Sequence, residues 1–208
     1  MIRRPRRDIG RKKATRNCND RVLIVCEGRK TEPQYFRGLK NHYRLTMVEV
    51  IGQGEDPEGV VREAKRKRKQ ESGSYEKIYC VFDRDKHENF DRACNKATHA
   101  NMIPIRSWPC FEFWLLLHFR FSRRPYDESG GNSTGQNCYN ELNNLWKETY
   151  SSTYKKAMPG TFKRLKERLA RAQDNAIRAL ADAETTKQWN PSTEVHKLVS
   201  YLQTIEQS

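Results

Sequence analysis

The sequence predicts an α/β protein with a mostly parallel sheet flanked by helices and with a C-terminal helical extension. Two short apolar runs, at residues 22–26 and 77–82, have the length and composition of strands buried on both faces. Helical patterns alternate with such runs at the spacing of right-handed crossovers between parallel strands. The length of 208 residues suits one domain with a sizeable core.

The N-terminal segment 1–20 combines many arginines and lysines with proline, glycine and asparagine, and it has neither helical nor strand periodicity. We interpret it as a disordered basic tail. Two roles are open for such a tail, a phosphate-binding arm and a solvated arm without function.

Residues 21–106 contain the alternation of strands and helices. Thr31 is a suitable cap for the first helix, with Glu32 and Pro33 in the first turn. Asp56-Pro57 is a comparable start signal for the second helix, which is heavily basic. In chain order we predict strands at 22–26, 46–51, 77–82 and 102–106, with helices at 31–39, 57–71 and 88–100.

Helices dominate the rest of the chain. The run 110–119 is apolar almost all round and is predicted to be a buried helix. Residues 120–137 are polar and rich in turn formers, which indicates a loop. Asn190-Pro191 is expected to start the last helix. We therefore expect an α/β core at 21–120, followed at 121–208 by a loop insertion and C-terminal helices packed on that core.

The net charge of +14 and the sequence pI of about 9.6 favour polyanionic partners, because clustered Lys and Arg release condensed counterions when they meet phosphates. Nucleic acid is the natural partner class, and solubility alone is the alternative explanation. The charge does not distinguish DNA from RNA, since both present the same phosphates.

No apolar run approaches the roughly 20 residues that span a bilayer, and no apolar stretch follows the N-terminal arginines as in a secretory signal. We expect a cytoplasmic protein that does not bind membranes. The six cysteines form no C-x-x-C pair, so reduced structural thiols are expected.

Three acidic residues follow the two clearest strands. Glu27 comes directly after one strand, and Asp83 and Asp85 follow the other. Ligands of open parallel sheets bind at the carboxyl ends of the strands, and residues two apart in an extended segment point the same way. Carboxylates without His or Cys select Mg²⁺ or Mn²⁺ over zinc. We predict that these three residues hold a divalent cation for phosphoryl chemistry.

A D-x-D sequence alone is weak evidence, because it also ends strands, pairs with arginines and occurs in sugar-nucleotide and aspartyl-phosphate enzymes. The last class usually has Thr or Val where this chain has His87. Arg84, between the two aspartates, is expected to face away from the site.

Two further acids have alternative interpretations. Glu32 lies in a first helical turn, where the helix dipole stabilises a carboxylate without any catalytic role. Glu112 lies in an apolar helix, where a charge is rarely buried unless it is paired or binds metal, and we predict a catalytic role for it.

Three basic residues near these acids are also candidates. His118 is expected to be a core histidine. Arg29 and Lys30 are predicted to contact nucleic-acid phosphates, with a plain surface role as the alternative.

Longer blocks of sequence carry a family resemblance. A strand ending in Glu27-Gly28 and a strand ending in Asp83-Arg84-Asp85 look like a Toprim domain, a Rossmann-like metal-binding catalytic fold. From about Arg21 to Leu202 the chain resembles the RloB-like family, which includes the second component of AbiL-type abortive-infection systems. The blocks concerned are 25–36, 82–85, 109–119 and 190–193.

The resemblance implies a Mg²⁺-dependent, Toprim-type endonuclease of bacterial anti-phage defence, in which Glu27, Asp83 and Asp85 match the metal-binding acids. It also implies a partner ATPase of ABC or AAA type, in keeping with the lack of a G-x-x-x-x-G-K-[ST] sequence here. The alternative is a non-catalytic module that binds nucleic acid or the partner. The trigger, the number of metals and the oligomeric state are left open, and a homo-oligomer is compatible with the sequence.

Overall fold

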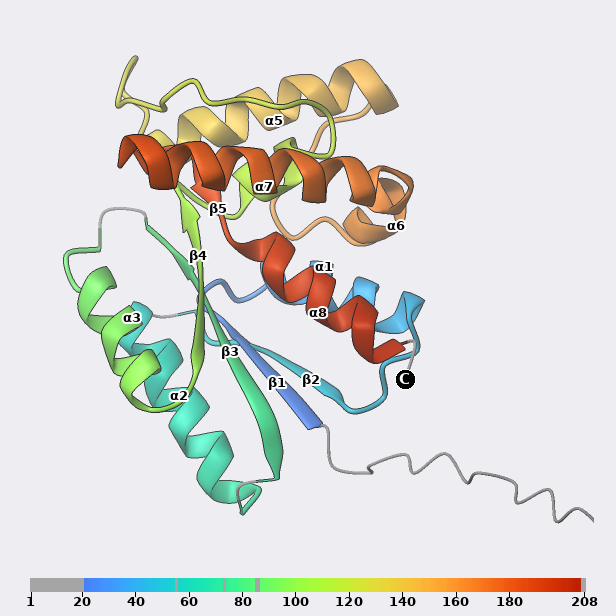
Figure 1. Cartoon of the computed structure of the whole chain (residues 1–208). Coiled ribbons are helices and arrows are strands. Elements are labelled where there is room, and N and C mark those ends of the chain that lie inside the picture. The colour runs from blue at the N-terminus through green and yellow to red at the C-terminus, as the bar shows by residue number, and fades with distance from the viewer. Residues whose placement is uncertain (1–20, 55, 73, 85–86, 207–208) are drawn as a thin grey trace, which may run out of the picture.

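A computed structural model describes residues 21–54, 56–72, 74–84 and 87–206 (Figure 1). The basic tail at 1–20 and Asp85 lie outside these ranges. The sheet has the strand order β2-β1-β3-β4-β5, in which the first four strands are parallel and β5 is antiparallel to β4. The strands are β1 (Arg21–Cys26), β2 (Val48–Gly52), β3 (Tyr75–Asp83), β4 (Ile103–Trp108) and β5 (Ser192–Thr193).

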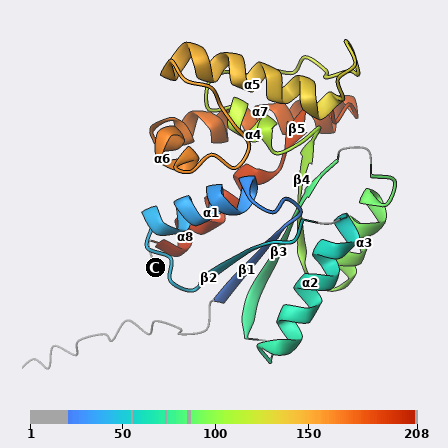
Figure 2. The same ribbon diagram turned by 180° about the vertical axis from the view of Figure 1, so that it is seen from behind.

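Helices cover both faces of this sheet, so the predicted α/β class with a mostly parallel sheet is confirmed. α2 (Pro57–Gln70) and α3 (Phe90–His99) lie on one face, and α1 (Thr31–His42) and α8 (Val195–Glu206) lie on the other (Figures 1 and 2). Beyond the carboxyl ends of the strands lie the remaining helices, which are α4 (Glu112–Leu116), α5 (Thr134–Tyr150), α6 (Thr161–Leu165), the 3-10 turn η1 (Lys166–Arg168) and α7 (Leu169–Thr186).

The alternating side chains of the central strands explain the two layers. Leu23 and Val25 face the α2 and α3 side, and Ile24 faces the α1 and α8 side, and all three are completely buried. A strand buried on both faces requires such a continuous apolar run. Asp56 starts α2 as predicted, because its carboxylate accepts the backbone N–H groups of Glu58 and Gly59 at 2.8 and 3.1 Å.

Two helix starts differ from the prediction. Thr31 is the first residue of α1, so Lys30 occupies the cap position, and Thr31 Oγ1 accepts the Ala157 N–H instead. Asn190-Pro191 does not start the last helix, because the next two residues pair with β4 as strand β5. The helix begins only at Val195, whose N–H donates to Thr193 Oγ1 at 3.2 Å.

The buried segment 110–119 is helical over a shorter length than predicted. α4 covers only Glu112–Leu116, and the N–H groups of His118 and Phe119 then bond to the carbonyls three residues back, which ends the helix. α5 begins at Thr134, inside the segment predicted as a loop, because Ser133 Oγ accepts the Gln136 N–H at 3.2 Å.

The buried pair Arg106–Glu194 joins the C-terminal segment to the sheet. Glu194 is 4 % exposed and accepts the Arg106 Nε and Nη2 groups at 2.7 Å each. Burial alone would raise the pKa of Glu194, but the hydrogen bonds from Arg106 hold it below its usual value.

We expect Glu194→Ala to lower the free energy of unfolding by about 3 kcal/mol, because the change strands a half-buried guanidinium without its partner. Urea titration measures the effect. Glu141→Ala is the matched control, since it removes an exposed pair with Arg120 and should cost no more than about 1 kcal/mol. Equal losses in the two variants would contradict the anchoring role of Glu194.

The five cysteines among the described residues are free and buried. In the same part of the chain, no helix has both the length and the apolar character needed to cross a bilayer.

Candidate metal and substrate site

A cavity of about 450 Å³ lies where the carboxyl ends of β1 and β3 meet the start of α1. Parallel strands bring these ends to one edge of the sheet, which is where open α/β sheets bind ligands. Four carboxylates from separate elements line it, namely Glu27, Glu32, Asp83 and Glu112. The other lining residues are Gly28, Arg29, Lys30, Thr31, Gly54, Lys156 and Ala157.

Glu27 is fixed at the end of β1 by its backbone and by its side chain. Its N–H donates to Val81 O at 3.1 Å, and its carbonyl accepts the Gly54 N–H at 2.7 Å. Its carboxylate accepts the Asp83 N–H at 3.3 Å and lies 3.1 Å from His87 Nε2. Glu27 and Asp83 are therefore neighbours, as the sequence predicts, and His87 is a contact that the sequence did not reveal.

Asp83 ends β3 with an unsatisfied carboxyl oxygen. Its Oδ1 is buried and has no hydrogen-bond partner among the described residues. Burial raises the pKa of Asp83 well above its usual value, and the neighbouring carboxylates of Glu32, Glu112 and Glu27 raise it further.

Glu32 belongs to the cavity and is not merely a surface cap. It is 5 % exposed, and its carboxylate accepts the Gly28 N–H at 3.2 Å. Burial, together with the charge of Glu112, raises the pKa of Glu32 to about 7. A Cβ at position 28 would collide with this carboxylate, so glycine is what allows the close approach.

Glu112 is 2 % exposed at the start of α4, and Lys156 Nζ lies 3.6 Å from its Oε1. The charge of Glu112 raises the pKa of Lys156. The segment that carries Lys156 is tied to α1, because the Ala157 N–H donates to Thr31 Oγ1 at 3.0 Å. The sequence analysis did not identify Lys156, because this residue lies in the segment between α5 and α6 and belongs to no recognisable motif.

The remaining predicted residues lie in four different places. Arg29 and Lys30 are exposed and line the cavity, as a contact to phosphates requires. Arg84 is not among the lining residues, and its guanidinium donates to His87 O at 3.2 Å. His118 is a core histidine that contacts Tyr35 Oη and Trp114 O at 3.3 and 3.1 Å. Asp85 lies outside the described residues.

The oxygen atoms of the four carboxylates are chemically suited to bind a hard cation. The four side chains offer only oxygen, which Mg²⁺ prefers, and the buried Asp83 Oδ1 is available for coordination. Within the part of the chain that the structure describes, no group of three or more His, Cys, Asp or Glu side chains lies close enough to hold a metal as it stands. A cation would have to draw these carboxylates together.

A family model described as RloB-like protein matches residues 22–202 of the chain. The search of curated proteins found no match. The search of solved structures likewise found none.

Proposed function

The chain belongs to the RloB-like family, and from this membership together with the site we propose that it is a Mg²⁺-dependent, Toprim-type endonuclease that cleaves nucleic-acid phosphodiesters. The observation that carries the proposal is Asp83 Oδ1, which has no hydrogen-bond partner among the described residues and belongs to one of the four carboxylates at one cavity. A site built in this way is stabilised by a cation, and a hard cation is the common agent of phosphodiester hydrolysis.

Glu27 and Asp83 would hold the ion together with Asp85. Bound there, Mg²⁺ supplies a water of lowered pKa and neutralises charge on the phosphoryl oxygens. Glu112 is buried beside Lys156 and is suited to take a proton from the attacking water. Arg29, on the rim of the cavity, is placed to hold a substrate phosphate.

The direct test is a cleavage assay with DNA, tRNA and total RNA. We expect cleavage of at least one polymer with Mg²⁺ or Mn²⁺, and none when EDTA is in excess. Cleavage that persists in EDTA would contradict the metal-dependent mechanism. No cleavage of any polymer, with or without a partner protein, would contradict the nuclease proposal.

We assign the biological role to bacterial anti-phage defence, under the control of a separate ATPase of ABC or AAA type. The family resemblance supports the assignment, and the sequence lacks a phosphate-binding loop of its own. We expect phage protection only when both proteins are produced in the cell, measured as plating efficiency. Full, regulated protection by this protein alone would contradict dependence on an ATPase.

A non-catalytic binding module is the second candidate, and one observation favours it. Lys156 Nζ lies 3.6 Å from Glu112 Oε1, so the chain's own lysine already balances part of the acidic charge. In that case nucleic acid would bind without being cut, and Mg²⁺ would change neither binding nor stability.

A further inference from the structure

A second cavity of about 340 Å³ lies between α1 and α6, which are neighbours in the fold (Figure 2). Gln34, Gly38 and His42 contribute the α1 wall, and Phe162, Lys163 and Lys166 contribute much of the opposite wall. The volume is within the range of small-molecule sites.

Aromatic rings and an unused acceptor give this cavity a specific chemistry. The exposed His42 ring has its centroid 5.8 Å from that of Phe162. Gln34 Oε1 is buried and has no hydrogen-bond partner among the described residues. An aromatic surface beside an unsatisfied amide oxygen suits a planar heterocycle that carries N–H donors.

The same two segments border both cavities. Thr31 of α1 and Lys156 line the first cavity, and Gln34 and Gly160 line the second. Gln34 follows Thr31 by about one helical turn, or roughly 5 Å along the helix axis, and His42 follows Thr31 by about three turns, or roughly 16 Å. A polymer bound with one phosphate at the carboxylates can therefore run along α1 and place a unit further along the strand beside His42.

The two cavities differ in their charged side chains. The first combines four carboxylates with Arg29, Lys30 and Lys156, whereas no carboxylate is among the described residues that line the second, where Lys163 and Lys166 lie. Lys163 is exposed and suited to contact a phosphate. Lys166 is paired with Glu167 at 3.3 Å, so Lys163 is the lysine that the second cavity offers to a phosphate-bearing ligand.

We propose that the cavity between α1 and α6 is a subsite for one unpaired nucleobase, stacked against His42, with its phosphate held by Lys163. The inference rests on the proposed nuclease function and adds a substrate class to it. A base inside a duplex has no free face, so the substrate is single-stranded or presents an extruded nucleotide.

The experiment is fluorescence binding of short single strands that carry 2-aminopurine, as DNA and as RNA, to the full chain in EDTA. The probe is quenched when its base stacks. Excess EDTA removes cleavage, so binding is measured independently of catalysis. The cleavage assay with Mg²⁺ therefore tests the nuclease proposal, and the fluorescence binding assay in EDTA tests the subsite.

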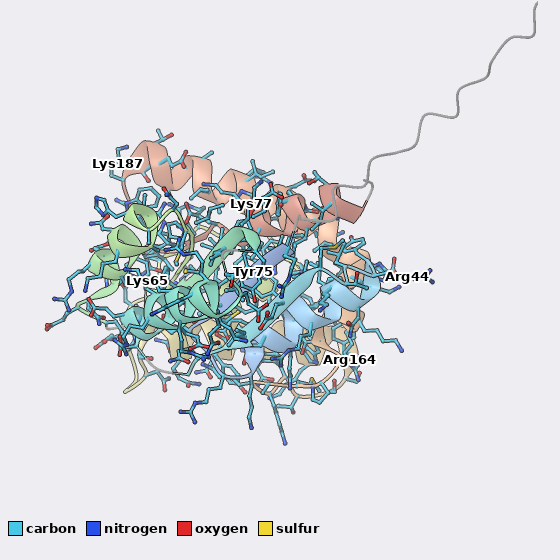
Figure 3. The ribbon with its side chains drawn as sticks, turned by 90° about the horizontal axis from the view of Figure 1, so that it is seen from below. Arg44, Lys65, Tyr75, Lys77, Arg164 and Lys187 are labelled. Atoms are coloured by element: carbon cyan, nitrogen blue, oxygen red, sulfur yellow. The ribbon has the colours of Figure 1, made fainter. Side chains whose placement is uncertain are left out.

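We expect His42→Ala to abolish the quenching and to weaken single-strand binding about tenfold, with duplex binding unchanged. Lys163→Gln should keep the quenching and lower the slope of log affinity against log salt by about one. His99→Ala and Lys65→Gln are the controls and should change neither quantity. Both control residues are exposed on the α2 and α3 side, and Figure 3 shows Lys65 on α2, away from Arg164 of α6.

Several results would overturn the subsite. One is unchanged quenching in His42→Ala whose melting temperature equals that of the wild type. Another is an equal loss of duplex and single-strand binding, and a third is no binding of any strand by the wild type. Quenching that depends on His42 in a protein that cleaves nothing would keep the subsite and reject the nuclease proposal.

Discussion

Asp83→Asn and Glu27→Gln should each lower Mg²⁺-dependent cleavage by roughly a hundredfold or more. Each change keeps the shape of the side chain and removes a negative charge from the cavity. The loss of several kcal/mol of metal-assisted charge stabilisation corresponds to more than two powers of ten in rate. Cleavage rates at saturating Mg²⁺ measure the effect, and Asp85→Asn belongs in the same series.

The same variants should differ from the wild type in their response to metal. Without a cation the carboxylates repel one another, so Asp83→Asn should melt at the wild-type temperature or higher. Mg²⁺ should raise the melting temperature of the wild type and raise that of the variant less, because binding to the folded state stabilises it.

Asp174→Asn is the matched control, since Asp174 is exposed on α7 and does not line the cavity. It should keep both cleavage and the metal response. If Asp83→Asn and Glu27→Gln also keep wild-type cleavage and the wild-type response to Mg²⁺, the carboxylates are not the metal site. A non-catalytic binding module would then be the better description of the protein.

The sequence was sufficient to predict why Glu27 and Asp83 meet. Each residue ends a continuous apolar run, and such runs form parallel strands whose carboxyl ends share an edge of the sheet. The register confirms this, because Cys26 pairs with Val81. Local pattern and sheet geometry together place these two acids.

Other parts of the cavity depend on contacts between distant segments, which local patterns do not contain. Lys156 lies 3.6 Å from Glu112, and the segment that carries it is hydrogen-bonded to α1 through Thr31. Glu32 has the position of an ordinary dipole-stabilised residue, and neither its burial nor its closeness to the charges of Glu112 and Lys156 can be predicted from the local pattern. β5 was missed for a related reason, since two residues carry no strand periodicity and their partner β4 lies far away in the chain.

Glu32 offers a test of the cavity that does not depend on catalysis. Its pKa is about 7 in the folded protein, against 4.5 for an ordinary glutamate. A carboxyl group with a raised pKa binds its proton more tightly when folded, so its favourable contribution to stability is complete below pH 4.5. That contribution is lost as the pH rises through about 7.

The wild-type stability curve alone would hide this effect. Burial lowers the pKa of His118 from 6.5 to about 4, and this shift has the opposite sign. Its stabilising contribution is present above pH 6.5 and is lost as the pH falls through about 4. Over the range from pH 5 to 7 the two groups oppose each other, so the informative quantity is a difference between variants.

Glu32→Gln should therefore unfold with a free energy about 3 kcal/mol higher than the wild type at pH 8 in EDTA, because ionised Glu32 costs roughly that much in this cavity. The difference should fall to about 1 kcal/mol near pH 5 and vanish below about pH 4, where Glu32 is protonated in both the folded and the unfolded state, and glutamine can still accept the Gly28 N–H. Urea titrations at a series of pH values measure the difference. Glu58→Gln is the control and should not be stabilised at pH 8, because Lys96 lowers the pKa of Glu58. If the difference in unfolding free energy between Glu32→Gln and the wild type stays constant from pH 5 to 8, Glu32 is ionised at little cost. That result would contradict a cavity in which the carboxylates are buried close together.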